Sequence, residues 1–282
     1  MPLSSHLIGI AFAVTSALVW GGGDFTGGYA TRRTSQYVVL TLSALSGLVV
    51  VVAAALVWRE PFPSLQGCLW AALGGFSGAL GIAAFYKALS LGHSAIVAPT
   101  AAVIGAILPV VASAFILGLP APIKLLGFGV ALVGIWLVST GPASGAALSR
   151  QTFVLACLAG LGFGGFFTFL GQVDPGVVFT PLIIARCLTV GVGLAMVWGQ
   201  RIRLPSITSN WLALLAGVLD AGGNLFYLLA KQYTRLDIAA VLSSLYPAST
   251  VFLSSVLLKE KVSRHQWVGV VICLFAIALI TA

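Results

Sequence analysis

Charged residues are scarce in this chain. Only 7% of its 282 residues are charged, six residues are acidic, and three are histidine. Soluble globular domains carry roughly a quarter charged residues, so the composition excludes an ordinary soluble domain. A metal centre or a nucleophile–base pair needs a cluster of acids, histidines or cysteines. These residue types are dispersed along the chain, and we therefore expect no metal, no cofactor and no enzymatic activity.

Signals of cross-linking, nucleotide hydrolysis and nucleic-acid binding are missing as well. The four cysteines (Cys68, Cys157, Cys187 and Cys273) lie in apolar runs without CxxC spacing, which favours buried packing residues over disulfides or metal ligands. No HExxH, GxSxG or GxxxxGK[ST] motif occurs, so uphill transport would need an ion or substrate gradient rather than ATP. The basic residues stand singly or in pairs in short segments, which excludes a phosphate-binding stripe.

Long apolar runs make up most of the chain. Hydrophobic residues account for 60% of it, and the mean hydropathy is +1.10. A membrane-spanning helix needs roughly 20 apolar residues, and runs without period-2 alternation favour helices over a barrel. The sequence therefore predicts an all-α polytopic membrane protein with ten transmembrane helices, near residues 7–30, 37–57, 67–89, 94–117, 123–140, 152–171, 177–198, 210–230, 237–258 and 265–281. We expect the first run to be a retained helix rather than a signal peptide, and no soluble domain after the last.

The second half of the chain repeats the first. A shift of about 141 positions places Phe85-Tyr86 on Phe226-Tyr227, and the segment 67–139 then runs beside 211–281 almost without gaps. Residues 1–141 and 142–282 are thus two predicted five-helix repeats. Because five is odd, the second repeat enters the bilayer from the opposite side. Inverted repeats around a central cavity are typical of alternating-access transporters, with the substrate site at the midplane.

Three ionisable residues stand out inside the predicted spans, away from their ends. Polar groups in the bilayer are costly and are functional candidates by default, and these are Asp24, Arg186 and Asp220. Arg186 and Asp220 stand at similar depth on consecutive spans and are expected to pair. The pair is either a structural clasp, a carboxylate-binding Arg for a zwitterionic substrate, or a proton-coupling acid. Asp24, among glycines, is expected either to meet a substrate amine or to lie near an aqueous mouth.

Further polar and aromatic residues suit a substrate pocket or a hinge. Tyr86 and Tyr227 are repeat-equivalent, which would place both against a central cavity, unless they are hydrogen-bonded core tyrosines. Proline within a span frees a carbonyl and permits a kink, so Pro99 and Pro247 are candidate hinges. The substrate-binding candidates are Trp20, Asp24, Tyr86, Thr100, Arg186, Asn224, Tyr227, Ser244 and Tyr246, and His93 and Thr168 also suit the pocket.

Several segments resemble a known family of carriers. The stretch SALVWGGGDF (residues 16–25), the passage FYKALSLGHSAIVAP (85–99) and the ending LYPASTVFLSSVLLKEKVSRHQWVGVVI (245–272) are similar to EamA-type carriers of the drug/metabolite transporter superfamily. The resemblance covers the whole chain. In the first repeat Leu119 stands where the family usually has an acidic residue, opposite Glu260. The resemblance implies export of amino acids or related metabolites, as in the YddG-like group.

Two arguments about orientation disagree. The even number of spans places both termini on one side. Basic residues are commoner in segments after odd-numbered spans than after even-numbered ones, which by the positive-inside rule puts the termini outside. The family resemblance implies termini in the cytoplasm, so the orientation stays open.

These observations predict a secondary transporter. We expect a monomeric protein of a bacterial inner membrane that exports small amphipathic metabolites, above all neutral or aromatic amino acids, by alternating access. Export of lipophilic drugs or of other metabolites is the alternative. A membrane-embedded enzyme or scaffold is a second alternative, but it does not explain the duplication together with the scattered midplane charges.

Overall fold

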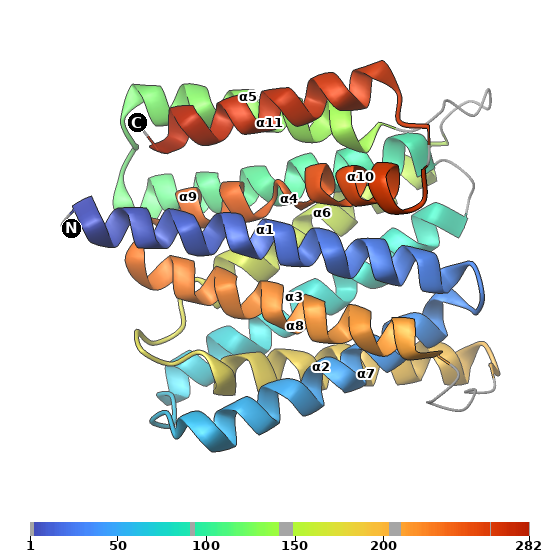
Figure 1. Cartoon of the computed structure of the whole chain (residues 1–282). Coiled ribbons are helices and arrows are strands. Elements are labelled where there is room, and N and C mark those ends of the chain that lie inside the picture. The colour runs from blue at the N-terminus through green and yellow to red at the C-terminus, as the bar shows by residue number, and fades with distance from the viewer. Residues whose placement is uncertain (1–2, 91–93, 141–148, 203–209, 260, 282) are drawn as a thin grey trace.

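A computed structural model describes residues 3–90, 94–140, 149–202, 210–259 and 261–281. Over these residues every regular element is an α-helix (Figure 1). The helices are α1 (Leu3–Thr31), α2 (Gln36–Trp58), α3 (Leu65–Ser90), α4 (Ser94–Leu117), α5 (Pro122–Ser139), α6 (Arg150–Leu170), α7 (Phe179–Gly199), α8 (Trp211–Tyr233), α9 (Leu236–Ser243), α10 (Tyr246–Leu257) and α11 (Arg264–Thr281). Ten segments of the described chain are long and apolar enough to span a membrane, with α9 and α10 forming one of them. The predicted ten-span all-α fold is confirmed.

The ninth span differs from the prediction. A continuous helix is predicted over 237–258, but the structure has a break at Ser244 and Leu245, between α9 and α10. Pro247 consequently lies in the first turn of α10 rather than inside a helix. In that turn a missing N–H leaves no hydrogen bond unmade, so Pro247 begins a helix instead of kinking one. Pro99, by contrast, lies inside α4 as predicted.

The helices pack as two related sets. α1 packs on α8 as α6 packs on α3, and α2 packs on α8 as α7 packs on α3. The α9–α10 span packs on α1 as α4 packs on α6, while the pairs α5–α11 and α2–α7 each relate a helix to its own equivalent. Both termini lie at the same end of the bundle (Figure 1), which we call the terminal face. The predicted repeat boundary at 141 and 142 lies outside the described residues.

The surface of the bundle is apolar and its centre is made of small residues. Large side chains such as Phe115, Trp198 and Val57 are more than 80% exposed, whereas the buried set contains many alanines. Lipid tails are as apolar as these exposed side chains, so helix association relies on close backbone packing instead. The glycines provide that packing: a Cβ at Gly160 would lie 2.6 Å from Cβ of Ile104, and one at Gly162 would collide with Gly81.

Candidate functional site

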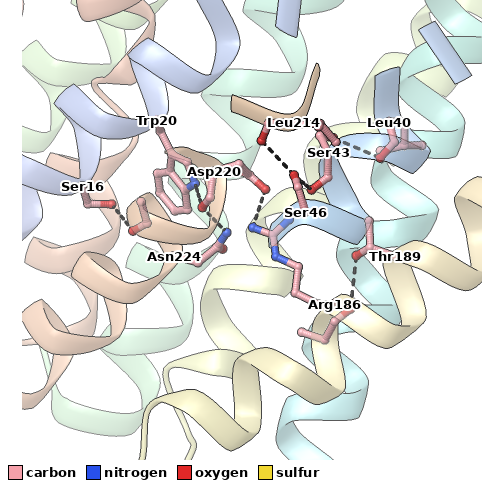
Figure 2. Close-up of polar contacts among 12 residues, drawn as sticks. Ser16, Trp20, Leu40, Ser43, Ser46, Arg186, Thr189, Leu214, Asp220 and Asn224 are labelled. Carbon is pink, nitrogen blue, oxygen red and sulfur yellow. Dashed lines mark hydrogen bonds and ion pairs between the residues drawn. The ribbon is translucent and has the colours of Figure 1, made fainter. Parts of the chain in front are cut away.

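The contact between α1 and α8 is polar as well as close. Ser16 Oγ donates to the carbonyl of Gly223 at 2.8 Å, and the Trp20 indole Nε1 donates to the carbonyl of Asp220 at 3.2 Å. The indole lies directly on Gly223, where an added Cβ would collide with the ring. The glycine therefore makes room for Trp20, and the two hydrogen bonds hold the indole against α8 beside Asp220 (Figure 2).

Arg186 and Asp220 form an ion pair between α7 and α8. One guanidinium nitrogen lies 2.5 Å from Asp220 Oδ2, and the side chains are 8% and 44% exposed, respectively. The guanidinium also lies against the backbone of α2, because a Cβ at Gly47 would be 3.3 Å from Arg186 Cζ. Figure 2 shows Asp220 between the indole of Trp20 on one side and Arg186 on the other. The two residues thus meet, while their role in transport stays a prediction.

Asp24 supplies a second carboxylate near this pair. It is exposed, and no ion pair holds it within the described part of the chain. The preceding residue, Gly23, packs on α8 at Asp220, and the Asp24 carboxylate interacts electrostatically with Asp220 and with the Tyr246 hydroxyl. The group thus contains one cation and two carboxyl groups, and only Asp220 is paired with the cation. An exposed carboxylate within a span must face water rather than lipid, so we expect Asp24 to border an aqueous passage.

Aromatic rings close the space beside the ion pair. The ring of Trp20 lies 5.4 Å from that of Phe167 and 6.3 Å from those of Tyr227 and Tyr246, measured between centroids. Tyr227 is wholly buried, and its hydroxyl donates to the Phe167 carbonyl at 2.5 Å. Tyr227 is therefore a hydrogen-bonded core residue in this conformation and does not line an open cavity. The side chain of its repeat partner, Tyr86, lies outside the described part of the structure.

At Trp20 the two repeats differ in packing. The offset that relates Phe25 to Phe167 places Trp20 on Gly162, and Gly162 packs tightly against Gly81 in the related contact between α6 and α3. A glycine-on-glycine contact in one repeat is thus an indole-on-glycine contact in the other. This difference places the indole of Trp20 beside the Arg186–Asp220 pair. Neither residue of that pair has an ionisable counterpart in the first repeat.

The remaining predicted residues are distributed around this centre. Asn224 is buried, donates to the Asp220 carbonyl at 2.6 Å, and has a side-chain oxygen without a partner in the described chain. Ser244 donates to the Ala240 carbonyl at the end of α9. Thr100 is buried on α4, which packs on α6, α5 and α9 rather than on α1. Thr168 bonds within its own helix, and His93 and Glu260 lie outside the described residues.

The break in the ninth span adjoins this centre. Gly21 packs against Ser249 and the Tyr246 carbonyl, and Thr250 donates to the Gly21 carbonyl at 3.3 Å. The amino end of α10 thus lies beside the part of α1 that carries Trp20 and Asp24. Interrupted helices that present half-helix ends at mid-membrane are typical of transporter binding sites. Among the described residues, no group of three His, Cys, Asp or Glu side chains could hold a metal ion.

Two acidic residues that the sequence analysis did not single out join the repeats at the terminal face. Glu60, after α2, accepts from the backbone N–H groups of Val178 and Thr180 at 2.8 and 2.6 Å, at the start of α7. Asp174, after α6, accepts from the N–H and hydroxyl of Ser64 at 2.7 and 2.9 Å, at the start of α3. Each acid caps a helix of the opposite repeat. In the sequence both acids directly precede a proline before a span, but that pattern predicts a cap on the next helix and not on a helix of the other repeat.

The fold and this centre are those of a ten-span membrane protein with charged groups inside its bundle, and comparison with known proteins gives its family. The model of the EamA-like transporter family matches residues 7–140 and again residues 151–282. The chain belongs to the EamA-like transporter family, within the drug/metabolite transporter superfamily, and is a multi-pass membrane transporter of small molecules. A family of transporters fits the expectation of a non-enzymatic protein.

Solved structures give the same architecture. The chain is similar to a crystal structure described only as that of a protein, with 21% sequence identity and a TM-score of 0.72. The similarity covers 98% of this chain and 96% of the other. At this level of identity the likeness concerns the fold alone. No curated protein matches the chain.

Proposed function

We propose that this transporter exports small amphipathic molecules that carry an amine, above all neutral and aromatic amino acids, by alternating access across a bacterial inner membrane. The observation that carries the proposal is the uncompensated carboxylate of Asp24, exposed within the span beside the Arg186–Asp220 pair. A carboxylate without a cation is suited to a substrate ammonium, because a charge-assisted hydrogen bond contributes about 1.5–3 kcal/mol.

The surroundings of Asp24 suit the rest of such a substrate. Trp20 and Tyr246 present aromatic rings next to the carboxylates. Aromatic faces attract both apolar side chains and cations, the latter by about 0.5–2 kcal/mol. The combination of an unpaired carboxyl group with aromatic rings favours an amphipathic amine over a polyanion such as a nucleotide sugar.

The surroundings of Arg186 bear on the choice between the two candidate substrate classes, amino acids and lipophilic cations. A guanidinium has five N–H donors, so Arg186 can hold a substrate carboxylate while it keeps Asp220. Yet its side chain is only 8% exposed and already engaged. That observation favours the second candidate, a lipophilic cation without a carboxylate. Because Arg186 is already engaged, Asp24 and Asp220 are the groups left as candidates for proton coupling.

Transport by the purified protein in liposomes tests the proposal. Vesicles are loaded in turn with radiolabelled threonine, methionine, phenylalanine and tryptophan, and with a lipophilic cationic dye. We expect release of at least one amino acid above protein-free vesicles. If all four amino acids stay inside while the dye leaves, the second candidate is correct.

The Arg186→Ala variant then separates a substrate contact from a structural clasp. A substrate contact predicts lost amino-acid transport in a protein that remains monodisperse in detergent, with transport of the cationic dye retained. A clasp predicts loss of monodisperse protein. Thr15→Val is the matched control, because the Thr15 hydroxyl donates only to the Ala11 carbonyl of its own helix.

A further inference from the structure

A cavity opens at the terminal face, away from Asp24 and the Arg186–Asp220 pair, which together we call the Asp24 centre. Its volume is about 400 Å³, within the roughly 300–1,000 Å³ of small-molecule sites. It lies between the end of α4, the segment that joins α6 to α7, and the segment that joins α8 to α9. Its apolar wall includes Val173, Val177 and Leu228, and its polar residues include Asp174, Lys231 and Arg235.

Lys231 is the free charge of this cavity. It lies in the last turn of α8 and is half-buried. Within the described chain no carboxylate or hydrogen-bond acceptor pairs with its ammonium. A lysine at a helix carboxyl end is stabilised by the helix dipole by about 0.3–1 kcal/mol, which accounts for its position in α8. The dipole does not supply the counter-charge that a half-buried ammonium beside a cavity lacks.

The other two charged residues of the cavity are already engaged, and to different degrees. Arg235 forms an ion pair with Asp237 at 2.9 Å and donates to the Gly118 carbonyl at 2.7 Å, so it fastens the end of α4 to the start of α9. Asp174 accepts two hydrogen bonds from Ser64. A carboxylate has about four acceptor positions, so Asp174 keeps capacity for a further donor.

The cavity therefore combines an unpaired ammonium, a carboxylate with free acceptor positions, and an apolar wall. These are the complements of a carboxylate, an ammonium and an apolar side chain. We propose that the cavity is a second binding site for a zwitterionic amino acid, whose carboxylate binds Lys231 and whose ammonium binds Asp174. This inference rests on the proposed function and extends it to a loading or release site on the terminal face.

The position of the cavity on α8 supports a sequential path. Asp220 and Lys231 are eleven residues apart on one helix, which corresponds to roughly 16 Å. Tyr227, with its hydroxyl fixed to the Phe167 carbonyl, lies between them and is wholly buried. A buried aromatic residue thus lies between the two sites along α8, as expected for two sites that a substrate occupies in turn.

Lysine labelling detects occupancy of this site independently of transport. The full chain in liposomes is treated with an amine-reactive reagent in large excess over any probe amine, and the modification of Lys231 is measured by mass spectrometry relative to that of Lys124. The probes are L-phenylalanine, phenethylamine, which lacks the carboxylate, and 3-phenylpropionate, which lacks the amine. L-Phenylalanine is expected to protect Lys231 most strongly, 3-phenylpropionate less, and phenethylamine not at all. Lys124, which donates to the Ile280 carbonyl, is the internal control. Equal labelling of Lys231 with and without L-phenylalanine would overturn the proposal.

A variant pair tests the contribution to transport. Lys231→Gln is expected to raise the half-saturating concentration of L-phenylalanine, applied from the terminal face, by roughly tenfold. Lys231→Arg keeps the positive charge and should bring the half-saturating concentration most of the way back to that of the unaltered protein. Arg59→Gln removes a positive charge that is exposed on the same face and does not line the cavity. An equal effect of Arg59→Gln would assign the change to surface potential and contradict the site.

The Asp24→Asn background separates this inference from the proposed function. Protection of Lys231 that persists in this variant shows a site independent of the central one. Loss of protection in it would make the effect indirect and overturn the inference. If the unaltered protein moves no amino acid, the proposed function fails whatever Lys231 does. If it moves amino acids without protection of Lys231, only the second site fails.

Discussion

The indole of Trp20 donates its hydrogen bond to the main chain of Asp220, the residue whose side chain holds Arg186. One residue of α8 thus joins the first helix of the first repeat to the second helix of the second. A movement of α1 relative to α8 must break this hydrogen bond, and a movement of α1 together with α8 displaces the ion pair. The asymmetric charges of the chain are therefore mechanically linked to the helix contact that the inverted repeats share.

Gly223→Ala tests the fit of the indole on α8. The new Cβ would collide with the Trp20 ring, so the ring must move and lose its hydrogen bond to Asp220. We expect transport to fall by at least roughly tenfold, with a stability loss of about 1–3 kcal/mol from overpacking. Gly191→Ala is the control, since nothing lies within 4 Å of a Cβ there. Equal transport rates for the two variants would show that the position of Trp20 is unimportant.

The two members of the ion pair should differ in their effect on stability. Asp220→Asn leaves the buried Arg186 without its counter-charge, whereas Arg186→Met leaves a carboxylate that is 44% exposed and can be hydrated. An unpaired buried charge costs about 3–5 kcal/mol. We therefore expect Asp220→Asn to be the more destabilising change in denaturant unfolding in detergent. The reverse order would mean that Arg186 has another partner or reaches water.

The reciprocal caps at the terminal face predict a joint effect on both repeats. Glu60→Ala and Asp174→Ala each leave backbone donors at a helix start unpaired. Loss of such a cap costs about 0.5–2 kcal/mol, so each variant should lower the thermal unfolding temperature. Glu60→Gln keeps an acceptor and should lose less. Unchanged unfolding of the alanine variants would contradict the capping role.

The two candidate hinges should respond differently to replacement by alanine. Pro99 lies inside α4, where alanine restores an N–H and straightens the helix. Pro247 begins α10, where alanine changes little. We expect Pro99→Ala to slow transport without destabilising the protein and Pro247→Ala to behave like the unaltered chain. Vesicle transport rates decide this, and slow transport only in Pro247→Ala would relocate the hinge to the broken span.

The sequence was sufficient for the number of spans and for the duplication, because both depend on hydropathy and repeated residues. It did not predict the break at Ser244 and Leu245, since Pro247 was interpreted as a kink within one continuous helix, whereas the structure ends one helix before it and begins another. The exchange of Gly162 for Trp20 between repeats became meaningful only once the helix pairs were known. The caps by Glu60 and Asp174 join segments more than one hundred residues apart, which local patterns cannot relate.

The central claim is that Asp24 binds the amine of the substrate. Its most direct test is the transport of phenylalanine by the Asp24→Asn variant in liposomes, measured against the unaltered protein and the Thr15→Val control. The account predicts a half-saturating concentration raised by roughly tenfold to a hundredfold in a protein that remains folded and monodisperse. Unchanged saturation by phenylalanine in a folded Asp24→Asn protein would contradict it.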